Sequence, residues 1–541
     1  MLGVCRMDNH IKKDNKKNII VFIIVVVLVI TVGILFIILN NKQNHNKSAN
    51  TGVKKVDSPY RLAGNDLEDF DLYFLGLENK NQNMIYSPLS IKYALEMLLE
   101  GTSGESKSQI AAIIGDYEAK KYENSANMSF ANALFVQNEF KNSIKSSYTD
   151  TLKNKYNASI IYDSFSTPDN VNAWISEKTL GLLQNVLDDV SDKDFLLINA
   201  LGIDMEWKNV IQPVPGGTPY DKLHSDYDGE FGVSYPHEKE TDESFTYSVG
   251  VSLLDSDFPP TINFNGKESK ALEFAASINN YDIINTLGRE NIENNIKKEY
   301  EKFVAEKTCG EGPYESTEEV VSKYMSEIGA NYKDVASSTD FRYLDNDDVK
   351  VFAKELKKYN NTTLEYIGIM PKEQDLSDYI KKMKAKDINQ IINNLVPITL
   401  EASEKNVITK IEGIVPIFKF DYELNFQKDL ESLGVKDVFN IDKANLSNLT
   451  SAQAEYIGAV KHKASIEFSN EGIKAAAATT VGGKGDMSCD FDYLYKVPVK
   501  KIDLTFDKPF MFIIRDKNSG EVWFAGSVYE GITQTNKYYI P

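Results

Sequence analysis

Hydrophobic positions divide the chain into an N-terminal apolar run and a long region of mixed helical and strand-like periods. Residues 19–39 form an uncharged run of 21 residues rich in Ile, Val, Leu and Phe. As a helix it would rise about 31 Å, close to the thickness of a bilayer hydrocarbon core. A cleaved signal peptide usually has only ~7–15 apolar residues, and no small-residue cleavage site follows this run. We therefore predict an uncleaved transmembrane signal anchor.

Charges on either side of the run predict its orientation. Four lysines between residues 12 and 17 precede it, so residues 1–18 are expected to be a basic cytoplasmic tail. Residues 40–60 are polar and are interpreted as a tether. Residues 61–535 would then form a domain on the outer side of the cell membrane, which makes the protein single-pass and extracellular in its main part.

Helical periods dominate the start of this domain. Residues 67–75 place apolar side chains at amphipathic helical spacing. Ser90 is expected to cap a second helix, which Gly101 ends. Short apolar runs at 129–137 and 194–203 are of strand type.

Strand-like periods dominate the end of the domain. They cover residues 501–506, 509–515 and 522–529, and residues 516–520 between the last two have hairpin-turn chemistry. Helices early and paired strands late indicate an α+β fold with a large, mostly antiparallel sheet component.

Composition excludes several functions. The formal net charge of −19 argues against nucleic-acid binding, which needs a basic surface to displace counterions. Cys5, Cys309 and Cys489 are far apart, and neither they nor the five histidines form a metal-binding pattern, so we expect no metal and no cofactor. The glycines of 482–485 lack phosphate-loop spacing, and no serine-hydrolase elbow is present. We do not expect an enzyme.

Four separated stretches resemble the serpin (serine protease inhibitor) family. Each carries short motifs in the family's order and spacing, including Ser87-Pro88-Leu89-Ser90-Ile91, Asn172-Ala173-Trp174 with Leu197-Ile198-Asn199-Ala200, Val415-Pro416-Ile417-Phe418, and Glu471-Gly472 with Pro509-Phe510 and Phe524-Ala525-Gly526. The resemblance covers most of residues 65–530. It implies a serpin fold with an exposed reactive-centre loop, and a suicide-substrate mechanism in which the cleaved loop inserts into the central sheet and traps a peptidase covalently.

The reactive-loop hinge would carry this mechanism. Its residues are Glu471, Gly472, Ile473, Lys474, Ala475, Ala476, Ala477, Ala478 and Thr479. As a strand, the segment alternates a small or apolar face, beginning at Ile473, with a face that carries Lys474. That alternation suits insertion into a half-buried sheet, although without the flanking motifs a small-residue exposed loop would also fit. Ile473 and Lys474 stand where serpins often carry Thr and an acidic residue.

The scissile bond has three candidate positions. Serpin spacing from Gly472 places it after Asp486, with Lys484 and Met487 as alternatives. An acidic site would suit peptidases that cut after Asp, and a lysine would suit trypsin-like enzymes. Twenty-two residues separate Asp486 from Pro509, which is longer than serpins usually have. Cys489 lies in this stretch as a solvated thiol or as a residue able to react or bridge.

A polar cluster beneath the sheet is the second site that the resemblance implies. The matching residues of this sheet switch are Ser87, Ser90, Asn199 and His462, with Trp207 under the hinge. Hydroxyl, amide and imidazole groups can satisfy one another when buried, so the cluster suits a sheet with two arrangements. It also suits a plain buried network.

Residues 209–338 are predicted to interrupt the domain as a family-atypical insertion. Residues 211–265 are turn-rich, and 289–335 have helical spacing. The predicted function is peptidase inhibition with a serine or cysteine peptidase as covalent partner, the membrane as a second contact, no nucleic acid, and a monomeric state. The alternative is a non-inhibitory serpin-fold surface binding protein that uses the insertion.

Overall fold

The computed structural model describes most of the chain from Asp57 onward. The described residues are 57–208, 226–227, 230–233, 261–279, 283–306, 314–330, 338–453, 455–458, 460–469, 472–473, 491 and 495–533. The predicted tail, signal anchor and nearly all of the tether lie outside them and stay predictions. Among the residues that are described, no helix has both the length and the apolar character needed to cross a bilayer.

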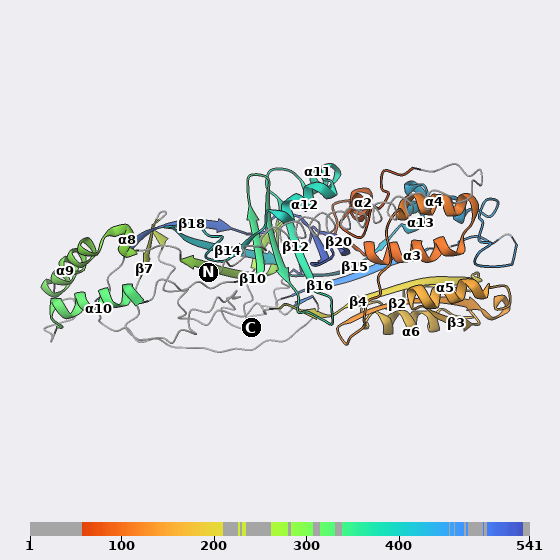
Figure 1. The fold of residues 1–541 in the computed structure, drawn as a ribbon, viewed down its shortest axis with the longest axis horizontal. Helices are drawn as coiled ribbons and strands as arrows, with labels where there is room; N and C mark the ends of the chain where they lie inside the picture. Colours follow the sequence, from red (N-terminus) through yellow and green to blue (C-terminus); the bar gives the residue numbers. More distant parts are fainter. Residues whose placement is uncertain are drawn as a thin grey trace, which may run out of the picture. The chain divides into compact units, whose positions relative to one another are not determined.

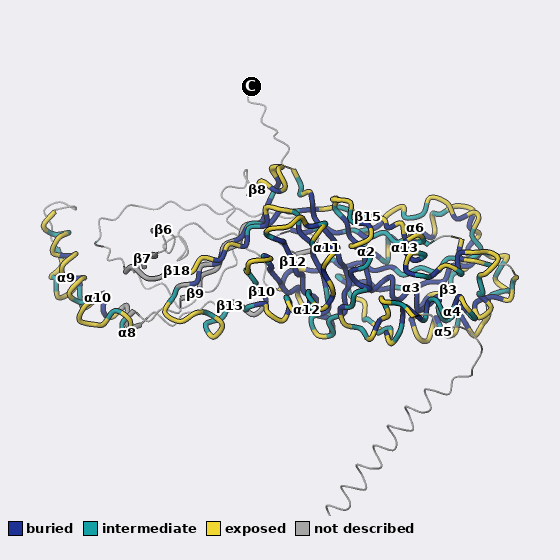
Figure 2. The backbone as a smooth tube through the Cα atoms, turned by 90° about the horizontal axis from the view of Figure 1, so that it is seen from above, coloured by how far each residue is buried: buried dark blue, intermediate teal, exposed yellow. Residues whose placement is uncertain are grey.

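A seven-stranded antiparallel sheet forms the centre of the core. Its strand order is β1 (Met84–Tyr86), β20 (Val522–Val528), β19 (Phe510–Asp516), β12 (Leu364–Pro371), β11 (Val349–Glu355), β10 (Ser338–Asp345) and β13 (Val396–Ile398). Strands β12 and β20 are buried along their whole length, as Figure 2 shows for β12, because other elements cover both faces. The predicted hairpin is confirmed, since β19 pairs antiparallel with β20.

A six-stranded sheet contains the longest of the described strands, β9 (Lys267–Asn279). Its order is β6 (Asp226–Tyr227), β7 (Glu230–Val233), β18 (Tyr495–Asp503), β14 (Ile408–Pro416), β9 and β8 (Thr261–Phe264). β14 pairs parallel with β18 and antiparallel with β9, and β14 and β18 run side by side in Figure 1. Part of the predicted insertion, residues 261–279, is therefore built into a sheet of the domain. The strand expected at 501–506 instead begins at Tyr495 and ends at Asp503.

Two smaller sheets complete the strands. One has the order β3 (Ser159–Asp163), β2 (Met128–Gln137) and β4 (Phe195–Ile203), which confirms the two short strands predicted near 129–137 and 194–203. The other has the order β15 (Phe418–Leu424), β16 (His462–Phe468), β17 (Gly472–Ile473) and β5 (Met205–Glu206). β5 follows β4 after one residue, so the two sheets meet there.

The helices surround these sheets, apart from one pair discussed below. They are α2 (Asp69–Glu78), α3 (Pro88–Gly101), α4 (Gly104–Ile114), α5 (Ser146–Tyr156), α6 (Asp169–Lys178), α8 (Ile283–Leu287), α9 (Arg289–Ala305), α10 (Thr317–Ala330), α11 (Leu376–Lys382), α12 (Ala385–Asn393) and α13 (Phe426–Leu433), with 3₁₀ turns at Asn138–Phe140 and Asp437–Phe439. Helices α9 and α10 confirm the helical spacing predicted between 289 and 335. Figure 2 shows that much of their length is exposed.

The start of α3 differs from the prediction. Ser87, and not Ser90, is its N-cap, because the Ser87 side chain accepts a hydrogen bond from the backbone N–H of Ser90 at 3.1 Å. Pro88 then takes the first helical position, where its missing N–H costs nothing and its fixed φ suits a helix. The predicted end at Gly101 is confirmed.

Candidate functional site: a strand-wide slot and its mouth

The two smaller sheets are parted along β4 and β16. At one end, the backbone of Ile473 in β17 pairs with Phe468 of β16 on one side and with Met205 of β5 on the other. A strand between two neighbours holds them about 9.6 Å apart, twice the usual strand spacing. Beyond this point the described residues show no pairing between β4 and β16. We call the resulting gap the slot; it is one strand wide, and β17 lies at its mouth.

A cavity of about 550 Å³ occupies the slot. Residues 195–201 of β4 line one side and residues 462–464 of β16 line the other. Ile91, Leu95 and Leu98 of α3 add an apolar surface. The cavity therefore offers strand edges on two sides and apolar contacts between them, which is the environment that an added strand needs.

The predicted sheet-switch residues Ser87, Ser90, Asn199 and His462 all line this cavity. The backbone N–H of Ser87 donates to Nε2 of His462 at 2.9 Å. Asn199 is not bonded to that group; its Nδ2 donates to Oδ1 of Asn132 at 2.8 Å. The carbonyl oxygen of the Asn199 side chain is buried without a hydrogen-bond partner among the described residues. The structure thus brings the four residues to one cavity but leaves the network open across the slot.

His462 is held in its neutral form. Burial lowers the pKa of its imidazole from 6.5 to about 4. The hydrogen bond from Ser87 also lowers the pKa of His462, because Nε2 can accept it only when that nitrogen carries no proton. At neutral pH the imidazole is therefore an uncharged acceptor on β16.

Trp207 closes the mouth of the slot from within. Its side chain is fully buried, and Nε1 donates to the carbonyl oxygen of Ser469 at 3.0 Å. Its ring lies 5.7 Å from Phe468 and 6.2 Å from Tyr366 in edge-to-face geometry. Phe468 and Ser469 precede Gly472 by only a few residues in the chain, and the role of Trp207 beneath the hinge stays a prediction.

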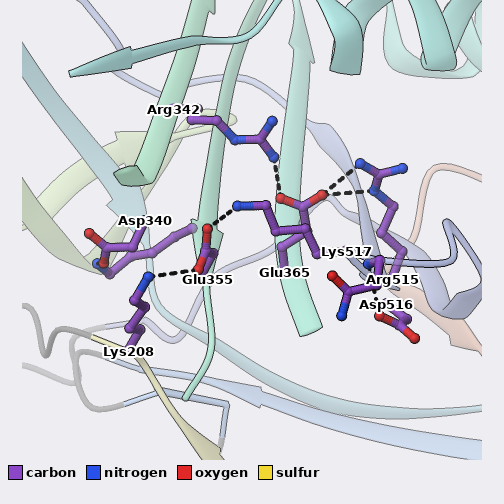
Figure 3. Close-up of polar contacts among 10 residues, drawn as sticks. Lys208, Asp340, Arg342, Glu355, Glu365, Arg515, Asp516 and Lys517 are labelled. Atoms are coloured by element: carbon purple, nitrogen blue, oxygen red, sulfur yellow. Dashed lines mark hydrogen bonds and ion pairs between the residues drawn. The ribbon is translucent and has the colours of Figure 1, made fainter. Parts of the chain in front are cut away.

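A charged network next to Trp207 was not predicted from the sequence (Figure 3). Glu355, at the end of β11, accepts hydrogen bonds from Lys517 and from Lys208, the latter at 3.0 Å. Burial alone would raise the pKa of Glu355, but these bonds outweigh it and hold the pKa below its ordinary value. The backbone N–H of Lys208 also donates to the carbonyl oxygen of Glu355 at 3.0 Å. The chain leaving β5 is therefore fixed to β11.

Three further ion pairs extend the network. Glu365 on β12 accepts from Arg515 on the neighbouring strand β19 and from Arg342 on β10, which reaches across β11 (Figure 3). Lys354 pairs with Asp340 at 3.0 Å, and both side chains are buried. The only sequence signal for this set is the recurrence of charged residues at the ends of otherwise apolar strands.

The loop residues divide between described and undescribed positions. Gly472 and Ile473 of the predicted hinge form β17. Glu471 and 474–479 lie outside the described residues, as do the scissile candidates Lys484, Asp486 and Met487 and the thiols Cys309 and Cys489. Continuing the register of β17 would bring Thr479 level with His462 on one side and with Asn199 on the other. The predicted hinge is therefore long enough to reach from the mouth of the slot to His462 and Asn199.

These features define a protein in which two sheets are parted by one strand position along β4 and β16, with a later segment of the same chain paired at the opening. A family model described as Serpin (serine protease inhibitor) matches residues 70–214 and 330–531, which is more than half of the chain. The chain belongs to the serpin family, and the resemblance found in the sequence is confirmed. Residues 215–329 lie between the two matched stretches, and we call them the intervening segment.

Individual relatives are distant. Mouse neuroserpin is 24% identical over 476 residues, spanning 83% of this chain and 86% of that protein. Human leukocyte elastase inhibitor is 30% identical over 182 residues, 33% of this chain and 44% of that protein. The native crystal structure of tengpin, a thermophilic serpin, covers 88% of this chain at 19% identity, with a TM-score of 0.53. A structure of thyroxine-binding globulin complexed with thyroxine has a TM-score of 0.51 at 14% identity. These two structures support the fold alone.

Proposed function

We propose that the protein inhibits a serine or cysteine peptidase as a suicide substrate. The observation that carries the proposal is the pairing of Gly472 and Ile473 between β16 and β5, at the mouth of a slot that the described residues otherwise leave unfilled. A peptidase attacks the loop near Asp486 and forms an acyl-enzyme. The freed hinge then enters the slot and carries the enzyme with it, so the target supplies all of the catalysis.

The slot supplies the driving force in this proposal. Each hydrogen bond that a new strand makes with β4 or β16 contributes a net ~1 kcal/mol. The segment would also fill part of a cavity whose lining includes the apolar side chains of Ile91, Leu95 and Leu98. Because the loop is linked to the rest of the chain on both sides before cleavage, the gain becomes fully accessible only after the bond is cut.

The test is incubation of the region from Lys55 onward, which forms a compact unit, with a panel of serine and cysteine peptidases. We expect an adduct that resists SDS, a cut at Lys484, Asp486 or Met487, and a higher melting temperature of the cleaved protein. The mapped cut identifies the target class. Cleavage in the loop with neither an adduct nor a gain in thermal stability would contradict the proposal.

The second candidate is a non-inhibitory surface binding protein that uses the intervening segment. The observation that favours it is the length of that segment, which no part of the family match covers. In this case, deletion of the loop would leave ligand binding intact, whereas deletion within 283–330 would abolish it.

We further propose that the serpin domain is displayed on the outer side of the cell membrane. The uncharged run at 19–39 and the lysines before it support this location. Peptidase added outside intact cells is expected to cut the loop and release no cytoplasmic marker. Protection of the loop until the cells are lysed would overturn the proposal.

A further inference from the structure

Phe491 is enclosed by aromatic side chains of the intervening segment. Its ring centroid lies 4.9 Å from that of Tyr300 and 5.4 Å from that of Phe303, both on α9, and 5.8 Å from that of Tyr324 on α10. The Tyr324 hydroxyl also donates a hydrogen bond to the backbone oxygen of Phe491. Ring contact and hydrogen bond together fix both the side chain and the backbone of one residue.

The two helices form a narrow platform for this residue. Apolar residues at helical spacing, Ile292, Ile296 and Tyr300, bury one face of α9, and Tyr324 is buried on α10. The Tyr300 hydroxyl donates to the carbonyl oxygen of Glu315 at 2.8 Å and so ties α9 to the segment that begins α10. A pair of helices has a small core of its own, and an added aromatic ring enlarges that core substantially.

Phe491 lies on the C-terminal side of every candidate scissile bond. It is five residues after Asp486, so at most about 18 Å of extended chain separates the two. After Phe491 the chain enters β18, which pairs with β7 as well as with β14. The C-terminal side of the loop is thus held at two successive places, both of which involve the intervening segment.

We propose that α9 and α10 form a clamp that fixes the C-terminal side of the reactive-centre loop, with Phe491 as the positioning residue that the clamp holds. The clamp, defined by Tyr300, Phe303 and Tyr324, rests on the proposed function in one respect, because it assumes that the loop is the segment that the target peptidase binds and cleaves. It accounts for the long spacing between Asp486 and Pro509, since the chain must reach the helix pair before it enters β18.

The clamp also limits which peptidases reach the bond. A standard interface covers about 800 Å² on each partner, a patch that extends roughly 16 Å from its centre. A peptidase centred on the scissile bond therefore reaches the neighbourhood of α9 and α10. The helix pair therefore excludes peptidases whose surface, next to the part of the cleft that binds the C-terminal side of the substrate, would clash with α9 and α10. After cleavage, the helix pair retains the C-terminal fragment of the loop.

The first test is hydrogen–deuterium exchange of the full-length chain, reduced so that Cys309 and Cys489 remain thiols. In Phe491→Ala we expect exchange within residues 289–330 to rise at least tenfold, with most of the protection restored in Phe491→Leu. Tyr162→Ala, which removes an exposed ring on β3, is the matched control and should leave exchange unchanged. Exchange within twofold of the wild type in Phe491→Ala would overturn the clamp.

The second test separates positioning from helix stability. A broad-specificity metallopeptidase cuts wherever a backbone is accessible, and the cut sites are mapped by mass spectrometry. We expect the wild-type loop to be cut before residue 489 and Phe491→Ala to gain cuts between 489 and 494. An unchanged map would refute positioning. Neither test needs an adduct, so failure of trapping and failure of the clamp are distinguishable.

Discussion

Replacing Ala477 with aspartate is expected to separate cleavage of the loop from stabilisation of the protein. Continuing the register of β17 places residue 477 opposite Ala464 of β16 and Leu201 of β4, and both of these are buried. A carboxylate there would be buried against these two apolar side chains and would lose its hydration. Such a group costs several kilocalories per mole, so insertion is expected to stop short of it.

The magnitude follows from the slot. Six residues beyond Ile473 make about twelve new hydrogen bonds, a net gain of ~12 kcal/mol. Ordering them costs about 9 kcal/mol. Filling 550 Å³ of a closed apolar cavity at about 24 cal/mol per Å³ would contribute roughly 13 kcal/mol, and we take about half of this value because the cavity is open and is lined in part by charged side chains. The net gain is on the order of 10 kcal/mol. Roughly 400 ordered residues unfold with an entropy of about 0.8 kcal/mol/K, so cleavage should raise the melting temperature by 10 °C or more.

The assay is scanning fluorimetry before and after cleavage by the peptidase that cuts the wild-type loop. We expect the rise in Ala477→Asp to be less than half that of the wild type, with no SDS-resistant adduct. Ala478→Asp is the control, because the same register places residue 478 opposite Lys463, which can pair with the new carboxylate. A full rise in Ala477→Asp, or no rise in the wild type, would refute the reasoning.

Three further changes test the structure around the slot. Burial and a hydrogen bond with Asp194 raise the pKa of Glu455 to about 7, so its stabilising contribution is present below about pH 4.5 and is lost as pH rises to 7. In urea unfolding between pH 5.5 and 7.5, Glu455→Gln should therefore lose about 1 kcal/mol less than the wild type, after discounting for solvent exposure. Glu355→Gln removes the negative charge at the slot's mouth and replaces one of the two acceptor oxygens used by Lys208 and Lys517 with an NH₂ donor, so it should cost about 1–3 kcal/mol in the same assay. Gly202→Ala should cost a similar amount, because a Cβ there would lie 2.7 Å from backbone atoms of Thr179 and displace the end of α6.

Each of these changes has a control or a contrary outcome. If Glu455→Gln has the same pH dependence as the wild type, the pKa of Glu455 is not raised by burial and by its hydrogen bond with Asp194. The control is Glu404→Gln, which breaks the exposed ion pair with Lys500 and should change the free energy of unfolding by less than 1 kcal/mol. An equal loss in Glu404→Gln and in Glu355→Gln would show that the charged network around Glu355 stabilises the protein no more than an exposed ion pair does. Gly76→Ala has nothing within 4 Å of the new Cβ and lies inside α2, so it should stabilise slightly.

The sequence predicted those parts of the site that depend on local pattern. Alternation of small residues predicts the hinge, of which the structure describes only Gly472 and Ile473, and helical spacing identified α9 and α10. Motif order grouped Ser87, Asn199 and His462, and the structure places these three residues around one cavity, while their role as a switch stays a prediction. Each of these inferences needs only the period of a strand or a helix, or the position of a residue within a known order.

The parts that could not be predicted depend on contacts between segments far apart in the chain. Glu355 meets Lys208 and Lys517 only because β11 ends beside both of their segments. Phe491 had one signal, a large apolar residue within a polar stretch, but nothing local indicates that its partners lie on α9 and α10. The N-cap of α3 was misplaced for a different reason, because Pro88 was not used as a marker of the first turn.

The contacts that hold the loop fall into two sets on opposite sides of the candidate scissile bonds. On the N-terminal side, β17 pairs with β16 and β5 at a slot that can accept the residues following it. On the C-terminal side, the clamp holds Phe491, and β18 pairs with β7 and β14. Before cleavage, any advance of the hinge into the slot draws on the chain that the clamp retains, so the clamp opposes premature insertion. Cleavage removes this opposition without breaking any contact of either set. A weakened clamp should therefore allow the uncleaved protein to lose inhibitory capacity faster on warming, and Phe491→Ala compared with Tyr162→Ala measures that effect directly.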